Sequence, residues 1–163
     1  PDNKQLAEQY KRMLKEHLEA ELAHFQEGAK NYPTDMRLRY EVGRRLLQLG
    51  RYDEAIPALQ EGQRDPKNHL QALSLLGQCF FKKKWYPDAI DLYSRALQSP
   101  DAVVGTIGKE LQYNLGRAYQ AAGQTEQAAK AYSVVAQTDF LYKDVRQRLD
   151  RLRTENQDRS DAG

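Results

Sequence analysis

The residues of this 163-residue chain that could do chemistry are few, and their spacing argues against a metal site. Of its three histidines, His17 and His24 lie seven residues apart, which is about two helical turns. A pair of histidines that binds zinc from one helix is usually three or four residues apart. We interpret both as surface residues, place His69 at a helix start, and expect no metal and no cofactor.

The single cysteine, Cys79, lacks the neighbours of a catalytic nucleophile. A reactive thiol needs a base beside it and a third group that orients the base. No histidine adjoins it in the sequence, and Phe80 and Phe81 follow it directly. We therefore expect a packed, unreactive thiol, and one cysteine also excludes a disulfide within the chain.

Residues 105–109, Gly-Thr-Ile-Gly-Lys, match only part of the glycine-rich pattern that binds phosphate. The full pattern is Gly-x-x-x-x-Gly-Lys followed by Ser or Thr, after a strand. Here Glu110 follows the lysine, and no strand is predicted before the loop. We expect neither nucleotide binding nor catalysis, so the chain is predicted not to be an enzyme.

Charge and hydropathy exclude two further classes of function. The net charge of +2 is far below the strong basic footprint that nucleic-acid-binding domains usually carry. No segment approaches 18 consecutive apolar residues, so no membrane-spanning helix is expected.

The chain begins Pro-Asp-Asn, which indicates a fragment of a longer protein. Its location is not encoded in these residues, and we expect a cytoplasmic one.

Two basic segments could still bind an anion. Residues 82–85, Lys-Lys-Lys-Trp, combine positive charge with an aromatic ring, as a nucleic-acid or acidic-lipid site would. Three lysines are few for such a surface, so we predict a solvated turn whose tryptophan is buried between two repeats. The basic face of the last helix is a better candidate, although Asp144 and Asp150 dilute its charge.

The elements that carry these residues follow a repeat. Small residues recur with spacings of 34 and then 39 residues in two series. The two series are Gly43, Gly77 and Gly116, and Ala55, Ala89 and Ala128. Because both series shift together, five residues must be inserted between the second and third units, around residues 99–108. Apolar residues within each unit follow helical spacing on both sides of a short breaker, which predicts helical hairpins.

The recurring glycines have a packing explanation. A glycine inside a helix costs about 1 kcal/mol relative to alanine. Three such glycines at one phase of the repeat indicate that two helices cross closely there, with the recurring alanine on the second helix.

This pattern resembles the tetratricopeptide repeat family. The resemblance rests on the Leu-Gly pairs at residues 76–77 and 115–116, the Asp-Ala-Ile start at residues 88–90, and Pro33 and Pro66 between units. It covers residues 34–139 and implies an all-α fold, a right-handed α-solenoid of about three helical hairpins. The resemblance also implies a module that binds a protein or peptide. Val42 and Lys84 depart from the family pattern, since leucine and glycine are usual there.

The predicted organisation has six parts. These are residues 1–33 as an N-terminal helix or degenerate repeat, 34–67 as the first repeat, 68–100 as the second, 101–139 as the third with its insertion, 140–153 as a capping helix, and 154–163 as a polar tail. Residues 3–31 are expected to form one long helix rather than a hairpin, because residues 13–20 contain no turn residue. Its apolar stripe would extend past the repeats and seek a partner.

By resemblance to the family, the first helix of each hairpin lines a concave face that binds the partner. The candidate residues are Arg37, Tyr40, Arg44, Gln48, Gln71, Ser74, Gln78, Phe81, Lys82, Tyr113, Asn114, Arg117 and Gln120. This lining is polar, aromatic and mildly cationic, which favours a peptide of acidic character gripped by Arg44 and Arg117. Some family members bind chaperone tails with a clamp of two lysines and two asparagines; of its positions, only Asn114 is similar here.

Two other functions stay open. One is self-association into a homo-oligomer through the N-terminal helix. The other is an accessory role within a larger multidomain enzyme.

Overall fold

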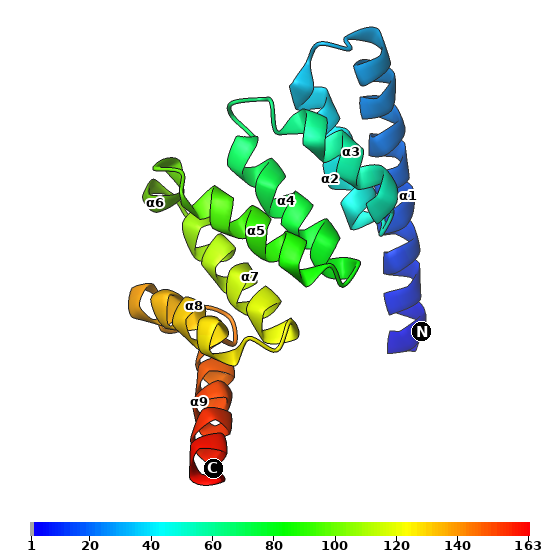
Figure 1. Ribbon diagram of the computed structural model, residues 1–163. Coiled ribbons are helices and arrows are strands. Elements are labelled where there is room, and N and C mark those ends of the chain that lie inside the picture. Colours follow the sequence, from blue (N-terminus) through cyan, green and yellow to red (C-terminus); the bar gives the residue numbers. More distant parts are fainter. Residues whose placement is uncertain (1) are drawn as a thin grey trace. The chain divides into compact units, whose positions relative to one another are not determined.

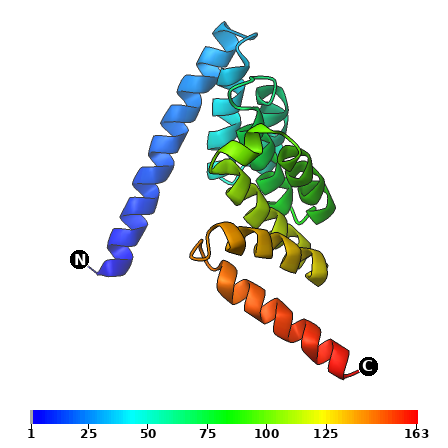
Figure 2. The same cartoon turned by 90° about the vertical axis from the view of Figure 1, so that its left-hand side faces the viewer.

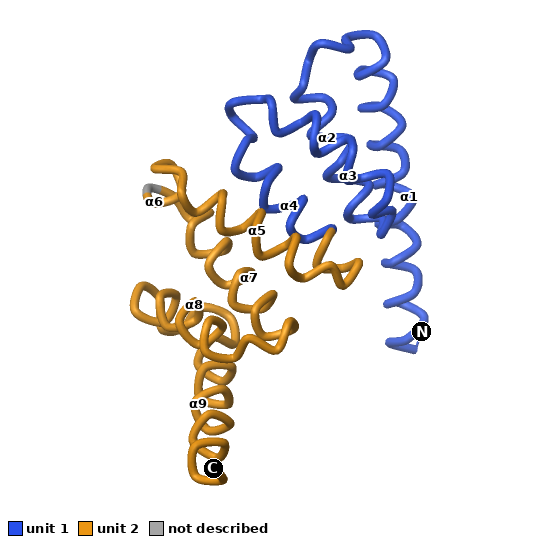
Figure 3. The backbone as a smooth tube through the Cα atoms, in the orientation of Figure 1, with its two compact units in different colours: residues 1–79 blue, residues 80–163 orange. Residues whose placement is uncertain are grey.

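The computed structural model describes residues 2–163, and the regular elements of this range are all α-helices (Figure 1). They are α1 (Asn3–Asn31), α2 (Met36–Gln48), α3 (Tyr52–Gly62), α4 (His69–Lys82), α5 (Tyr86–Leu97), α6 (Asp101–Val104), α7 (Ile107–Ala121), α8 (Thr125–Thr138) and α9 (Val145–Asp161). The predicted all-α fold class is confirmed. The chain divides into two compact units, residues 1–79 and 80–163 (Figure 3).

In the N-terminal unit, α1 is one continuous helix, as predicted, and its N-terminal half extends beyond the other helices of the unit (Figure 2). Asp2 caps its start by accepting a hydrogen bond from the Lys4 backbone N–H at 3.4 Å. Burial begins only at Leu18 and continues with Leu22 and Ala29, where α1 packs on α2. The first half of α1 therefore has no packing partner within its unit.

The α2–α3 hairpin crosses closely, as the recurring glycines predicted. A Cβ added to Gly43 would lie 2.5 Å from Leu59 Cγ, so only glycine fits here without movement. Gly62 makes a second close approach, which the repeat pattern did not predict: its Cβ would lie 2.6 Å from the Tyr40 Cα. Two glycines, one on each helix, thus bring the backbones of α2 and α3 together.

In the C-terminal unit, α7 packs on α5 and α8, and α8 packs on α9. A Cβ on Gly116 would lie 2.7 Å from the Tyr132 ring, which repeats the close crossing of the other hairpin. The buried residues Val145, Leu149 and Leu152 of α9 complete the core around Tyr132. The helix covers the last hairpin, as a cap must, because open repeat ends expose core.

The C-terminal end differs in detail from the prediction. The capping helix begins at Val145, after a turn, and runs to Asp161. Residues from 154 onward, predicted as a polar tail, are polar but helical as far as Asp161. Side-chain contacts one turn apart support this extension, for example Gln157 Nε2 to Asp161 Oδ1 at 3.0 Å.

The region expected to hold the five-residue insertion, residues 99–108, contains the short helix α6 and the start of α7. α6 packs on both α5 and α7. Gly108 lies so close to the Ala102 carbonyl oxygen that a side chain there would require the backbone to move.

Each hairpin turn contains one residue whose backbone has the left-handed conformation, with a positive φ. Gly50 has φ 75° and Gly123 has φ 78°, and Lys84 takes the same place in the α4–α5 turn with φ 63°. This conformation costs a non-glycine residue about 1 kcal/mol or more.

The prediction that Trp85 is buried between repeats is wrong: the residue is 52% exposed. It lies in the turn and stacks on Phe80 of α4, with ring centroids 5.7 Å apart, so one side stays open.

Candidate partner-binding surface

In the first helix of each hairpin, one residue lies next to the helix crossing and is also accessible to solvent. Arg44, Gln78 and Arg117 each follow the recurring glycine of their repeat. Successive helical residues are about 100° apart around the axis, so these side chains lie beside the crossing rather than in it. Arg44 is exposed, and Gln78 and Arg117 are half-buried.

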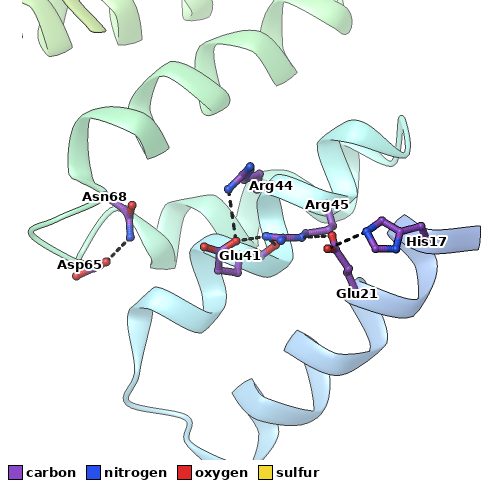
Figure 4. A network of polar contacts seen from close by, with 7 residues as sticks. All are labelled: His17, Glu21, Glu41, Arg44, Arg45, Asp65 and Asn68. Carbon is purple, nitrogen blue, oxygen red and sulfur yellow. Dashed lines mark hydrogen bonds and ion pairs between the residues drawn. The ribbon is translucent and has the colours of Figure 1, made fainter. Parts of the chain in front are cut away.

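The guanidinium of Arg44 lies beside a carboxylate that another arginine already uses (Figure 4). Glu41 accepts a hydrogen bond from Arg45 and lies 3.8 Å from Arg44 Nη1. Arg44 keeps 46% of its side chain exposed, whereas Arg45 keeps only 11%. The donors of Arg44 therefore remain largely free for a carboxylate from outside.

Arg45 joins α2 to α1 rather than facing a partner. Its Nε donates to Glu21 Oε2 at 3.0 Å, and its guanidinium lies 4.5 Å from the centroid of the Phe25 ring. This hydrogen bond is the largest cause that holds the pKa of the Glu21 carboxyl below its usual value. Glu21 also contacts His17 Nε2 at 3.1 Å, so the histidine is a surface residue that pairs along α1.

In the C-terminal unit, Arg117 is held by an aromatic ring. Its guanidinium lies 4.8 Å from the centroid of Phe81, and the Phe81 ring in turn meets Tyr86 edge-on at 5.3 Å. Among the described residues, Arg117 forms no ion pair with a carboxylate. A guanidinium stacked in this way is oriented while its N–H donors stay available.

Tyr113 is covered by the segment that leads into α9. Its hydroxyl donates a hydrogen bond to Asp144, and its ring meets that of Tyr142 edge-on at 5.5 Å. Lys143 Nζ lies 5.0 Å from the same ring. Burial and the hydrogen bond to Asp144 raise the pKa of the Tyr113 hydroxyl. This tyrosine supports the end of the array and has almost no surface left for a partner.

Gln120 is likewise engaged inside the C-terminal unit. Its Oε1 accepts a hydrogen bond from the Tyr132 hydroxyl at 2.8 Å and another from Arg148 Nη1 at 2.9 Å. Burial raises the pKa of Tyr132 to about 12, so the hydroxyl remains a donor at any physiological pH. Gln120 therefore connects α7, α8 and α9.

The thirteen candidate residues divide by exposure. The exposed ones are Arg37, Arg44, Gln48, Gln71 and Lys82; the half-buried ones are Gln78, Phe81, Arg117 and Gln120; the buried ones are Tyr40, Ser74, Tyr113 and Asn114. Arg37 is partly occupied, because its Nη2 lies 3.2 Å from Asp35 at the start of α2. A partner can therefore meet only part of the predicted surface, and the buried residues position the rest.

Sequence reasoning missed the residues that contact the candidates from other elements. Glu41 has a readable signal, since it precedes Arg45 by four residues on one helix. Asp144 and Lys143 have none, because they lie 30 or more residues from Tyr113 and reach it only through the fold.

A cavity of about 310 Å³ lies beside the insertion in the C-terminal unit. Its lining includes Val103, Val134 and Val135, with Lys109 among its few polar residues. Lys109 Nζ is already paired with Asp139 Oδ2 at 2.9 Å and so lowers the pKa of that carboxyl. The cavity thus presents mainly apolar side chains and no unpaired charge from this lysine.

The other residues that sequence reasoning considered for chemistry lie apart from this surface. Within residues 2–163, no group of three His, Cys, Asp or Glu residues is placed to hold a metal ion. Cys79 is 0% exposed, and burial raises the pKa of its thiol to about 12, so it is unreactive in the folded chain. No helix in the described range is long and apolar enough to cross a membrane.

Comparisons with known proteins agree with the repeat pattern. Two family models, both described as tetratricopeptide repeat, match residues 40–103 and 110–133. No curated protein matches the sequence.

Several solved structures share the backbone arrangement. A crystal structure of the MamA protein has a TM-score of 0.76 and 19% identity, over 93% of this chain and 80% of that one. MamA from Desulfovibrio magneticus RS-1, from its residue 41 to the end, has a TM-score of 0.75 and 22% identity, over 93% and 86%. YrrB, a tetratricopeptide repeat protein with an unusual peptide-binding site, has a TM-score of 0.71 and 17% identity, over 88% and 72%. At these identities the likeness shows the fold alone.

Proposed function

Because the chain belongs to the tetratricopeptide repeat family, we propose that it is a protein-interaction module that binds an acidic peptide segment of a partner protein and performs no catalysis. Stacked helical hairpins offer extended surfaces rather than enclosed reaction sites. Among the similar folds, YrrB is described as having a peptide-binding site, which supports a peptide as the ligand.

The observation that carries this proposal is a pair of arginines at one repeat position with spare hydrogen-bonding capacity. Arg44 shares its nearest carboxylate with Arg45, and Arg117 stacks on Phe81 with no carboxylate beside it in the described chain. A guanidinium binds a carboxylate through two parallel hydrogen bonds. An acidic side chain or chain terminus is therefore the ligand group that each arginine fits.

The neighbours of Arg117 suit a peptide interface. Phe81 and Tyr86 supply aromatic surface next to the guanidinium, and aromatic residues with arginine dominate the binding energy of many interfaces. Lys82 is exposed and adds positive charge nearby in the sequence. Gln48 and Gln71 are exposed polar residues that can bond to a peptide backbone.

A selection from a random peptide display library on the purified chain tests the proposal. Enriched peptides are then labelled, and their affinities are measured by fluorescence anisotropy. We expect enrichment in Asp and Glu. The double variant Arg44→Glu with Arg117→Glu should bind such peptides at least tenfold more weakly, because a hydrogen bond to a charged group contributes about 1.5–3 kcal/mol.

The matched control is Lys11→Glu with Lys15→Glu on α1, which makes the same change in net charge at exposed positions. This control should bind almost as the unchanged chain does. Selected peptides without acidic residues, or equal losses in the two double variants, would refute a specific role for Arg44 and Arg117.

A second candidate function, self-association, is favoured by the first half of α1. Four large apolar side chains there are open to solvent: Leu6 at 48%, Tyr10 at 68%, Met13 at 68% and Leu14 at 45% exposed. At 3.6 residues per turn, this stripe is turned by roughly 100° from the face that packs on α2. The same stripe on a second copy is a self-complementary partner, since a two-fold interface pairs one surface with itself.

Analytical ultracentrifugation over a range of concentrations tests this second function. We expect a reversible dimer that Tyr10→Glu with Met13→Glu converts to a monomer. The control Gln5→Glu with Gln9→Glu adds the same charge to the same half of α1 outside the stripe, and should leave the dimer intact. A monomeric unchanged chain at high micromolar concentration would exclude self-association through α1.

A further inference from the structure

The turn between α4 and α5, together with the helix ends that flank it, has a composition that the repeat fold does not require. Residues 80–86 read Phe-Phe-Lys-Lys-Lys-Trp-Tyr, so every residue is either aromatic or lysine. The corresponding residues 46–52 read Leu-Leu-Gln-Leu-Gly-Arg-Tyr, and residues 119–125 read Tyr-Gln-Ala-Ala-Gly-Gln-Thr. The same turn is thus built twice without this combination. We call residues 80–86 the aromatic–basic turn.

The backbone of this turn keeps a lysine where the other turns use glycine. Lys84 has φ 63°, next to 75° and 78° at Gly50 and Gly123. Two backbone hydrogen bonds fix the turn, from Lys84 N to Phe81 O at 2.9 Å and from Trp85 N to Phe80 O at 2.8 Å. A strained residue that a glycine would relieve is grounds for a functional hypothesis.

The turn combines an exposed aromatic ring with exposed lysines. Trp85 is 52% exposed and stacks on Phe80 at an interplanar angle of 24°. Lys83 Nζ lies 5.2 Å from the centroid of the Trp85 ring. Lys82 and Lys84 are exposed, and neither forms an ion pair with any residue that the structure describes. The turn therefore exposes a supported tryptophan, and two unneutralised lysines lie within three residues of it in the sequence.

We propose that the aromatic–basic turn docks on the anionic headgroup region of a lipid bilayer. Tryptophan concentrates at the boundary between headgroups and acyl chains because its ring is apolar and its indole N–H is polar. Lysines next to an anionic bilayer raise the affinity about fivefold each. Their methylene stems can lie along the apolar boundary while the ammonium groups reach phosphate and carboxylate.

The geometry favours a bilayer over a nucleic acid. A nucleic-acid backbone needs a track of basic residues along its length, whereas the basic residues here occupy one turn. The next helix carries the acidic residues Asp88 and Asp91, and Asp91 pairs with Arg95 at 3.1 Å. A flat bilayer needs to meet only the tip of the turn. The contact is weak and reversible alone, and the variants that test it leave Arg44 and Arg117 unchanged.

The experiment uses the only tryptophan of the chain, Trp85, as its probe. The chain is titrated with vesicles of phosphatidylcholine containing phosphatidylserine, and separately with phosphatidylcholine alone. Burial of the ring at the bilayer boundary should shift its fluorescence to shorter wavelength with the anionic vesicles only, and added salt should weaken the effect. Free phosphoserine at the same concentration should produce no shift, since it offers a headgroup without an apolar boundary.

The variant Lys82→Gln with Lys84→Gln should bind the anionic vesicles about 25-fold more weakly in a co-sedimentation assay. The control Lys11→Gln with Lys15→Gln removes the same charge from exposed positions of α1 and should bind as the unchanged chain does. Far-ultraviolet circular dichroism and the melting temperature verify that both variants fold.

Three results would overturn the proposal. The first is no fluorescence shift with anionic vesicles at low salt. The second is an equal loss of vesicle binding in the two lysine variants, which would indicate a general charge effect. The third is a shift with single-stranded DNA but none with vesicles, which would assign the turn to nucleic acid.

Discussion

Replacing Gly62 with alanine tests the close crossing of α2 and α3 most directly. The added Cβ would lie 2.6 Å from Tyr40 Cα and 2.7 Å from Tyr40 N. These are backbone atoms, so no rotation of a side chain can relieve the contact. The two helices must separate by about 0.8 Å to reach the 3.4 Å of ordinary van der Waals contact.

The expected loss in the free energy of unfolding follows from that separation. Forcing an extra carbon into a packed core costs about 1–3 kcal/mol. Gly62 is the last residue of α3, so alanine gains little helix propensity to offset this cost. We expect the free energy of unfolding to fall by about 2 kcal/mol. With an m-value of about 2 kcal/mol/M, the urea midpoint would move about 1 M lower.

The measurement is urea unfolding followed by circular dichroism, with Gly28→Ala as the matched control. Gly28 lies inside α1, and its Cβ would meet Leu38 of α2 at 3.5 Å, which is ordinary van der Waals contact. This control should be neutral or should raise stability by up to about 1 kcal/mol. Equal midpoints for the unchanged chain and Gly62→Ala, or equal losses in both variants, would refute the steric argument.

Three further outcomes are expected. Lys84→Gly should raise the melting temperature by relieving about 1 kcal/mol of backbone strain, whereas Gly123→Lys should lower it by a similar amount. The hydrogen bond from Arg45 holds the pKa of the Glu21 carboxyl below 4.5. The ionised Glu21 therefore stabilises the fold fully above pH 4.5, and this contribution is lost as the pH falls through the pKa of the folded state. Glu21→Gln should make the free energy of unfolding less dependent on pH in the acid range. Cys79 should resist alkylation in the native chain and react only in denaturant, since burial raises its pKa to about 12; rapid native labelling would contradict this.

Two interaction sites would give the module separate attachments. Arg44 and Arg117 are proposed to bind a peptide, and the aromatic–basic turn is proposed to dock on a bilayer; the variants that test the two proposals change different residues. A weak bilayer contact gains from a second attachment, because binding at one site raises the local concentration at the other.

Local features of the fold could be predicted because they require certain residue types at regular spacings in the sequence. Helical hairpins follow from apolar spacing, and the crossing at Gly43 and Gly116 follows from glycines that recur at one phase. Both signals depend on side-chain size and on 3.6 residues per turn, which are properties of the chain itself. The candidate surface could be predicted only as a set of positions on the first helices.

The remaining features depended on the tertiary structure. Gly62 approaches the backbone of Tyr40 across 22 residues of sequence, and Asp144 reaches Tyr113 across 31. The exposure of Trp85 likewise depended on which neighbours cover the turn. Sequence by itself determined that this chain forms tetratricopeptide hairpins, because the repeat period and small residues encode each helix pair. Only the tertiary structure decided which candidate side chains a partner can reach, because burial depends on elements that pack from elsewhere in the chain.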